Sequence, residues 1–243
     1  YFSNSAFLED NTPSYLIEND NHWLIAIGRG IENYGKAELG FIHGRLRDEY
    51  YHTSNYRKKD TLDKTTLDFI SPYFYIDINT LNRKQYASRG NRIQFRLSFV
   101  NGRERHQPGS TSLFTNISTN WHNWLTARFS YNQYFDISDN QSFGLLVQSV
   151  FSNQKSFNNY TASILYAPTW QPIPEASTRY LPNFRSYAYT ALGAIYVFTP
   201  IKNIDLRAEI HIYHPFKEIK DNNEQLAVLD NNSITALDDG SPL

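Results

Sequence analysis

The sequence predicts an all-β fold, an antiparallel transmembrane β-barrel, and three observations lead to it. Long segments alternate between apolar and polar residues, as strands do when the two faces of a sheet meet different surroundings. Several of these segments reach about 11 residues, enough to span a bilayer, whereas strands of soluble proteins average about 5–6. The chain also has 18 Tyr, 16 Phe and 4 Trp, an aromatic content typical of barrels with rings at both lipid–water boundaries.

The rest of the composition excludes several classes of protein. A length of 243 residues suits one large domain, and a net charge of −1 gives no reason to expect a nucleic-acid partner. The chain has no Cys, so disulfides, thiolate zinc sites and cysteine nucleophiles are excluded. Its apolar runs are too short for a membrane-spanning helix.

The clearest strand is in residues 204–216. Apolar residues occupy the even positions from Ile204 to Ile212, and polar residues occupy the odd positions from Asp205 to Tyr213. One face of this strand is therefore apolar and the other charged. In a membrane barrel, the first would face lipid and the second the lumen.

The same reading gives about nine strands in all. They are expected at 23–31, 37–47, 67–79, 91–104, 121–135, 143–151, 160–167, 187–198 and 204–214. In 37–47, Ile42 and Leu46 fall on the face opposite Leu39 and Phe41, which predicts a bulge. In 67–79, Asp68 is assigned to the polar face, and Pro72 weakens the ladder.

Three regions follow from this pattern: a leading loop (1–21), a transmembrane β-barrel segment (22–216) and an acidic loop (217–243). Further loops are expected at 48–64, 105–120 and 168–186, the last because it contains four Pro. The chain begins and ends in loop-like sequence without a closing strand, so a fragment of a longer barrel is expected.

Charged residues on the polar faces form the candidate site. A confined interior favours pairing of opposite charges through charge-assisted hydrogen bonds. Such a network either fills the lumen structurally or guides ions or substrate through it. The residues are Arg92, Arg96, Arg128, Asp205, Arg207 and Glu209.

The sequence gives no reason to expect a catalytic residue, a cofactor or a metal. It contains no Gly-x-Ser-x-Gly elbow. His211 and His214 are three apart on one strand and point to opposite faces, and His52, His106 and His122 have no ligand-like spacing. The acidic residues after 217 are expected to be a solvated loop.

Two stretches resemble a known family. Residues 79–104, with Asn-Thr-Leu-Asn-Arg and then Gly before a long strand, resemble the strand–turn–strand of bacterial surface antigen barrels. Residues 101–109 and 180–189, the second running into the 204–216 strand, resemble the C-terminal barrel of outer-membrane patatin-like phospholipases. The resemblance covers about two-thirds of the chain.

The resemblance implies a barrel of about 16 strands, preceded in full members by a patatin-like hydrolase domain and a small periplasmic domain. It also implies a loop arginine that tucks into the lumen and pairs with acidic wall residues. Phe184 and Arg185 match that loop best, although Phe here precedes Arg, and Asp205 or Glu209 would be the partners.

The expected function is therefore membrane anchoring, with translocation of an acyl-hydrolase domain or of lipid, in the outer membrane of a Gram-negative bacterium. Membrane lipid is the expected partner, with phospholipid as the substrate of a domain outside this chain, and a second copy or another membrane protein as a further partner. Two alternatives stay open: an assembly or transport barrel without hydrolase, and a soluble β-sandwich binding module.

Overall fold

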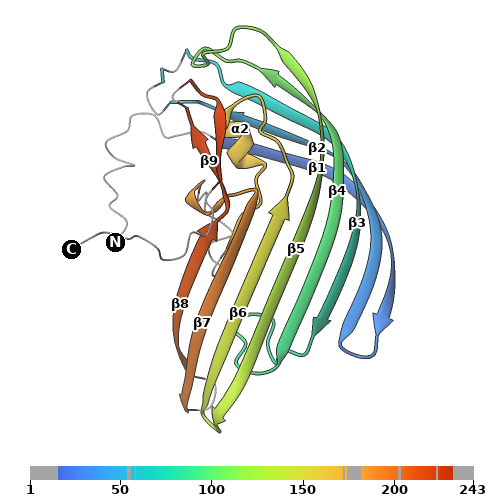
Figure 1. The fold of residues 1–243 in the computed structure, drawn as a ribbon, viewed down its shortest axis with the longest axis vertical. Helices are drawn as coiled ribbons and strands as arrows, with labels where there is room; N and C mark the ends of the chain where they lie inside the picture. Colours follow the sequence, from blue (N-terminus) through green and yellow to red (C-terminus); the bar gives the residue numbers. More distant parts are fainter. Residues whose placement is uncertain are drawn as a thin grey trace, which may run out of the picture.

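The protein is all-β, built around one large antiparallel sheet (Figure 1). The computed structural model describes residues 16–53, 56–57, 59–171, 173, 182–201, 204–222 and 224–231. Each strand of the sheet pairs with the next along the chain, and the sheet is open between its first and last strands. Its strands are β1 (Leu16–Ile31), β2 (Gly35–Tyr50), β3 (Asp63–Asn79), β4 (Asn91–Gln107), β5 (Ser118–Ser138), β6 (Gln141–Ser152), β7 (Ala188–Ile201) and β8 (Ile204–Pro215).

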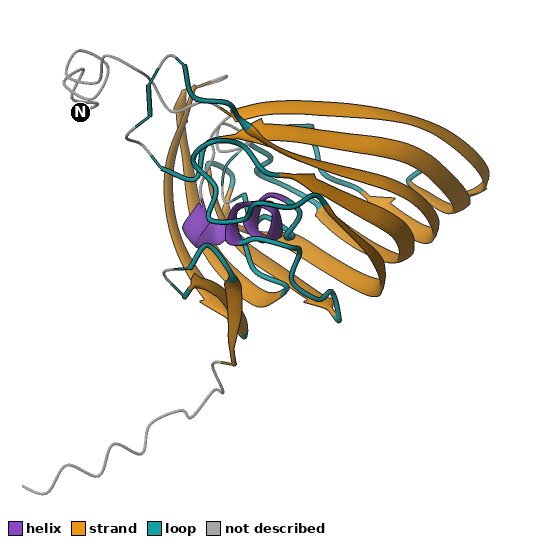
Figure 2. Ribbon diagram, turned by 90° about the horizontal axis from the view of Figure 1, so that it is seen from above, coloured by secondary structure: helices purple, strands orange, loops and turns teal. Residues whose placement is uncertain are grey.

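The sheet is strongly curved, and smaller elements lie inside the curve (Figure 2). These are helix α2 (Tyr160–Leu165), the 3-10 turn η2 (Pro182–Phe184) and a hairpin of β9 (Lys217–Asp221) and β10 (Ala227–Asn231). We call residues 153–171 and the β9–β10 hairpin the cap. The cap lies at the end of the sheet that carries the β2–β3, β4–β5 and β6–β7 connections. The opposite end, which we call the turn end, carries the short turns after β1, β5 and β7 and the longer β3–β4 connection.

Side chains of the cap pack against the concave face. Phe157 and Ala162 form an apolar cluster with Leu67 of β3 and Trp124 of β5. The Phe157 ring also stacks on His122, with ring centroids 4.5 Å apart. One part of the buried core therefore lies between the cap and one end of the sheet. A second part, made of Ala87, Tyr134, Ile195 and Val197, lies where the β3–β4 connection packs on β5 and β7.

Residues 160–167, predicted as a strand, are mainly helix, and that prediction is wrong. Asn159 caps the helix, since its Oδ1 accepts a hydrogen bond from the Ala162 backbone N–H at 2.8 Å. The apolar residues at 162, 164 and 166 fit a strand by alternation, but a run this short cannot separate strand from helix. The helix N-capping residue, Asn159, was the signal that the sequence prediction overlooked.

Other boundaries also differ from the predictions. Residues 16–21 belong to β1, residues 48–50 extend β2, residues 63–64 begin β3, and residues 217–231 contain the β9–β10 hairpin. The predicted bulge in β2 is absent along its continuous register with β1 and β3, and Ile42 and Leu46 simply face the concave side. Asp68 lies on the convex face, because it shares its register row with Arg45 and Arg103. Residues 1–15 and 232–243 of the predicted end loops lie outside the described residues.

The described residues include no helix whose length and apolar character would let it span a bilayer.

Candidate functional site

The convex face of the sheet is apolar and exposed. In the middle of the strands the outward side chains are mostly apolar. On β8, Ile204, Leu206, Ile210 and Ile212 all point away from the cap. Ile210 is 73% exposed and Ile27 of β1 is 82% exposed. Isolated exposed apolar residues are common, but a continuous exposed apolar face marks an interaction surface.

Strand register makes this face continuous. Leu39 of β2 pairs with Ile27 on one side and Phe74 on the other, and Phe74 pairs with Leu97 of β4. Leu97 in turn pairs with Ala127 of β5. We call the outward apolar residues of the eight strands the apolar band.

Polar and aromatic residues bound the apolar band on the side of the cap. One register row there reads Arg45, Asp68, Arg103 and Trp121 across β2 to β5. Asp68 forms ion pairs with both arginines, and Trp121 is 73% exposed. An exposed Trp therefore lies beside paired charges at the edge of the apolar band.

The concave face carries charged side chains beside apolar ones such as Ile195 and Val197, and several of these charges are paired. On β4, Arg92 makes a bidentate ion pair with Asp77 of β3. Its Nε and Nη2 donate to Oδ1 and Oδ2 of Asp77 at 2.9 and 2.7 Å. The guanidinium of Arg96 lies over the ring of Tyr73, 4.0 Å from its centroid. These predicted site residues therefore lie inside the curve and have partners there.

The charged residues of β8 form a second network. Arg207 contacts Glu209 and donates to the hydroxyl of Tyr134 at 2.8 Å and to the carbonyl of Ala87 at 2.7 Å. Glu209 also contacts Nε2 of His211 at 3.0 Å. Arg207 thus ties β8 to β5 and to the β3–β4 connection.

The structure gives Asp205 a partner other than the one expected. Asp205 pairs with Arg83 and accepts a hydrogen bond from Thr199 Oγ1 at 2.7 Å. Arg185 donates from Nη1 to the carbonyls of Ile164 and Leu165, at 3.3 and 2.6 Å. These hydrogen bonds connect Arg185 to the C-terminal end of α2.

Arg185 and Arg128 line the same hollow inside the curve. It measures about 410 Å³ and is also lined by Trp124, Gln154 and Gln171. Phe184, the other residue of the predicted loop motif, packs edge-on against Trp170, with ring centroids 5.2 Å apart. The motif therefore lies on the concave side, as part of the contacts beneath the cap.

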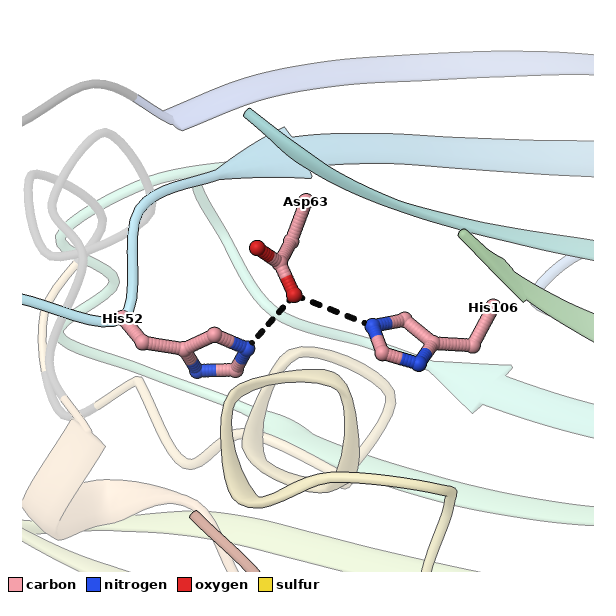
Figure 3. Close-up of side chains that lie close together, drawn as sticks. All are labelled: His52, Asp63 and His106. Atoms are coloured by element: carbon pink, nitrogen blue, oxygen red, sulfur yellow. Dashed lines mark hydrogen bonds and ion pairs between the residues drawn. The ribbon is translucent and has the colours of Figure 1, made fainter. Parts of the chain in front are cut away.

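A buried His–Asp–His cluster lies between the cap and the sheet (Figure 3). Nε2 of His52 and Nε2 of His106 lie 2.9 and 3.1 Å from the same carboxylate oxygen, Oδ2 of Asp63. All three side chains are almost completely buried. The other carboxylate oxygen accepts the backbone N–H of Gly109 at 2.9 Å, and Nδ1 of His52 lies 3.2 Å from Thr161 Oγ1 of the cap.

Hydrogen bonds keep the buried carboxyl group of Asp63 ionised. Burial alone would raise the pKa of Asp63, but the bonds from His106, His52 and Gly109 hold that pKa well below its usual value. Asp63 is thus a buried carboxylate held as an anion. A neighbouring pair follows the same design, with His122 Nε2 2.7 Å from Glu104 and Glu104 accepting the backbone N–H of Asn158.

The cluster also has the donor set of a transition-metal site. Two imidazole nitrogens and one carboxylate oxygen lie within 4.8 Å of one another, and zinc accepts such ligands at about 2.0–2.2 Å. A bound ion would take the place of the protons now shared with Asp63. The described cluster supplies three protein donors, and a structural zinc site needs a fourth.

Sequence reasoning missed this cluster because its members are far apart in the chain. His52 follows β2, Asp63 begins β3, and His106 is near the end of β4. Consecutive antiparallel strands bring these three positions to the same end of the sheet. Correct strand boundaries would have revealed it, whereas ligand spacing could not.

No family model, curated protein or solved structure matches this chain.

Proposed function

We propose that this chain is a membrane-spanning segment of an outer-membrane β-barrel, with the apolar band facing lipid and the concave face lining the lumen. The observation that carries the proposal is the direction of the alternation. In the middle of the strands the outward side chains are apolar, and the ion pairs at that height, such as Arg92–Asp77 and Arg207–Glu209, point into the curve. A membrane barrel has this arrangement, apolar outside and polar inside.

The alternative of a soluble sandwich requires the opposite. Two packed sheets bury their apolar faces against each other, but here the cap covers the concave face and the apolar band on the convex face stays exposed. Strand length also favours the membrane, since β2, β3 and β4 have 16, 17 and 17 residues, more than the roughly 9–11 that a spanning strand needs. The extra length carries the strands beyond the apolar band toward the cap.

Barrel closure is part of the proposal. The edges of β1 and β8 are open in the described sheet, and unpaired backbone groups are not tolerated in the hydrocarbon region. Further strands would therefore pair with β1 and β8 in the membrane. They would come from a longer polypeptide or from another copy.

Lipid contact can be tested with the native tryptophans. Trp23 and Trp121 lie on the convex face, at the edge of the apolar band, and Trp124 lies against the cap. In vesicles of lipids brominated along the acyl chain, we expect the fluorescence of Trp23 and Trp121 to be quenched. A Trp23→Phe/Trp121→Phe variant, which keeps Trp124 and the buried Trp170, should be quenched much less. Equal quenching of the two proteins, or no association with vesicles, would argue against the proposal.

We further propose that the parent protein is an outer-membrane patatin-like phospholipase or a related surface antigen protein. The support is the resemblance of residues 79–104, which form the end of β3, a connection ending in Gly90, and β4. The test is the sequence of the intact native polypeptide upstream of residue 1. A Gly-x-Ser-x-Gly elbow there is expected for the phospholipase, and periplasmic repeats alone would favour the assembly or transport barrel.

A further inference from the structure

A group of cationic side chains lies on the convex face, next to the apolar band. Arg45 and Arg47 are on β2, and Arg103 and Arg105 are on β4. All four are exposed and share the outward alternation of Leu39 and Leu97. We call these four residues, together with Lys64 of β3, the arginine patch.

Strand register fixes the shape of the patch. Arg47 and Arg105 lie on either side of Thr66 in one row, and Arg45 and Arg103 lie on either side of Asp68 in the next. Residues two apart on a strand are separated by about 7 Å, and strands two apart by about 10 Å. The four Cα positions therefore mark the corners of a rectangle about 7 by 10 Å, a size that a phosphate group with its neighbouring hydroxyls can bridge.

The patch has a clear excess of positive charge. Its five cations face two outward carboxylates: Asp68, paired with Arg45 and Arg103, and Glu49, paired with Arg47 and Lys64. That leaves three positive charges uncompensated. In the part of the chain that the structure describes, Arg105 has no ion pair, so its guanidinium is free to bind an anion.

The position of the patch specifies the kind of anion. Trp121 continues the row of Arg45, Asp68 and Arg103, and the next outward row toward the turns includes Trp23 and Ile70. Side chains change from apolar to aromatic to cationic over these few rows. In a bilayer, the same change of depth leads from the acyl chains to the headgroup phosphates. Arginine is the preferred side chain for binding a phosphate.

We propose that the arginine patch binds the headgroup phosphate of an anionic membrane lipid, with Arg105 as the main ligand. Arg47, whose partner Glu49 is shared with Lys64, completes the site on the other side of the Thr66 hydroxyl. The lipid belongs to the leaflet on the side of the cap. Arg45 and Arg103 stay partly committed to Asp68 and contribute mainly through their charge. This inference rests on the proposed membrane function, because only a bilayer would hold a lipid at this height.

The test compares an Arg47→Gln/Arg105→Gln variant with the unsubstituted protein, called the parent in this test, in phosphatidylcholine vesicles with and without phosphatidylglycerol. After extraction into a mild detergent, native mass spectrometry counts the phosphatidylglycerol retained on each protein. An arginine near an anionic surface contributes about five-fold in affinity, so the double variant should bind about thirty-fold more weakly. An Arg29→Gln/Arg89→Gln variant makes the same charge change near the turn end and should retain the parent's lipid.

The outcomes separate the two proposals. If the parent inserts into both kinds of vesicle but retains no phosphatidylglycerol, or if the patch variant retains as much as the parent, the patch is not a lipid site and the membrane proposal stands. If the parent fails to insert into either lipid, the membrane proposal itself fails. Preferential loss in the patch variant, with insertion intact, supports both.

Discussion

Replacing Leu39 by arginine tests the membrane proposal most directly. Leu39 lies at the centre of the outward apolar residues of β2, between Ile27 and Phe74. Its side chain is 65% exposed in the isolated chain. If water covers this face, Leu39→Arg removes little packing, and the free energy of unfolding should change by no more than about 0.5 kcal/mol. If lipid covers it, the charge enters hydrocarbon, and the loss should be about 2–4 kcal/mol.

The assay is urea unfolding in phosphatidylcholine vesicles, followed by tryptophan fluorescence. Gln107→Arg is the matched control, since it adds the same side chain at an exposed outward position beyond the apolar band, and its cost should be near zero. The expected result is a large loss for Leu39→Arg and almost none for the control. Similar small losses for both variants would refute the assignment of the convex face to lipid.

Three further predictions concern the cap and the concave face. Burial raises the pKa of Asp48 from 3.8 to about 6, so the folded protein holds a proton that the unfolded chain releases near pH 4. The free energy of unfolding should therefore fall as pH rises from about 4 to about 6. Above pH 6, Asp48→Asn should be more stable than the unsubstituted protein by at most about 3 kcal/mol. Urea titrations at several pH values measure this, and equal pH profiles for the two proteins would contradict it. Asp63→Ala leaves two buried imidazoles without their shared acceptor, and the free energy of unfolding should fall by about 3–5 kcal/mol. A loss under 1 kcal/mol would show that the cluster does not stabilise the packing of the cap on the sheet. Gly40→Ala places a Cβ within 2.3–2.5 Å of the ring and hydroxyl of Tyr73, so displacing the ring should lower the free energy of unfolding by about 1–3 kcal/mol. When Tyr73 is already replaced by Leu, adding Gly40→Ala should cost much less, which is measured by comparing Gly40→Ala/Tyr73→Leu with Tyr73→Leu.

Much of the sheet could be predicted from the sequence because alternation is a local property. Strands β4, β5 and β8 were located from side-chain period alone, and the facing of Asp205, Arg207 and Glu209 into the curve follows from the same period. Their boundaries were less predictable, because the strand ends beyond the apolar band are polar on both faces. Residues 16–21 and 48–50 show this loss of contrast.

The partners of the charged residues could not be predicted from a single strand. Arg83 is far from Asp205 in the sequence, yet the curve of the sheet brings the β3–β4 connection to β8. Arg185 was expected at an acidic wall residue, but α2, which was not predicted, presents its C-terminal carbonyls there instead. Pairing across an enclosed space depends on which segments share that space, which no local pattern encodes.

The sequence by itself determined the all-β class and the two chemically different faces of the strands, because period-two alternation fixes both. Only the tertiary structure decided which face is covered. The cap folds onto the concave face through Phe157 and leaves the apolar band of the convex face exposed. It also decided the functional groupings: His52, Asp63 and His106 meet at one sheet end, and the four outward arginines meet across β2 and β4. Both groupings arise from strand register, which sets neighbours across the sheet independently of their distance along the chain.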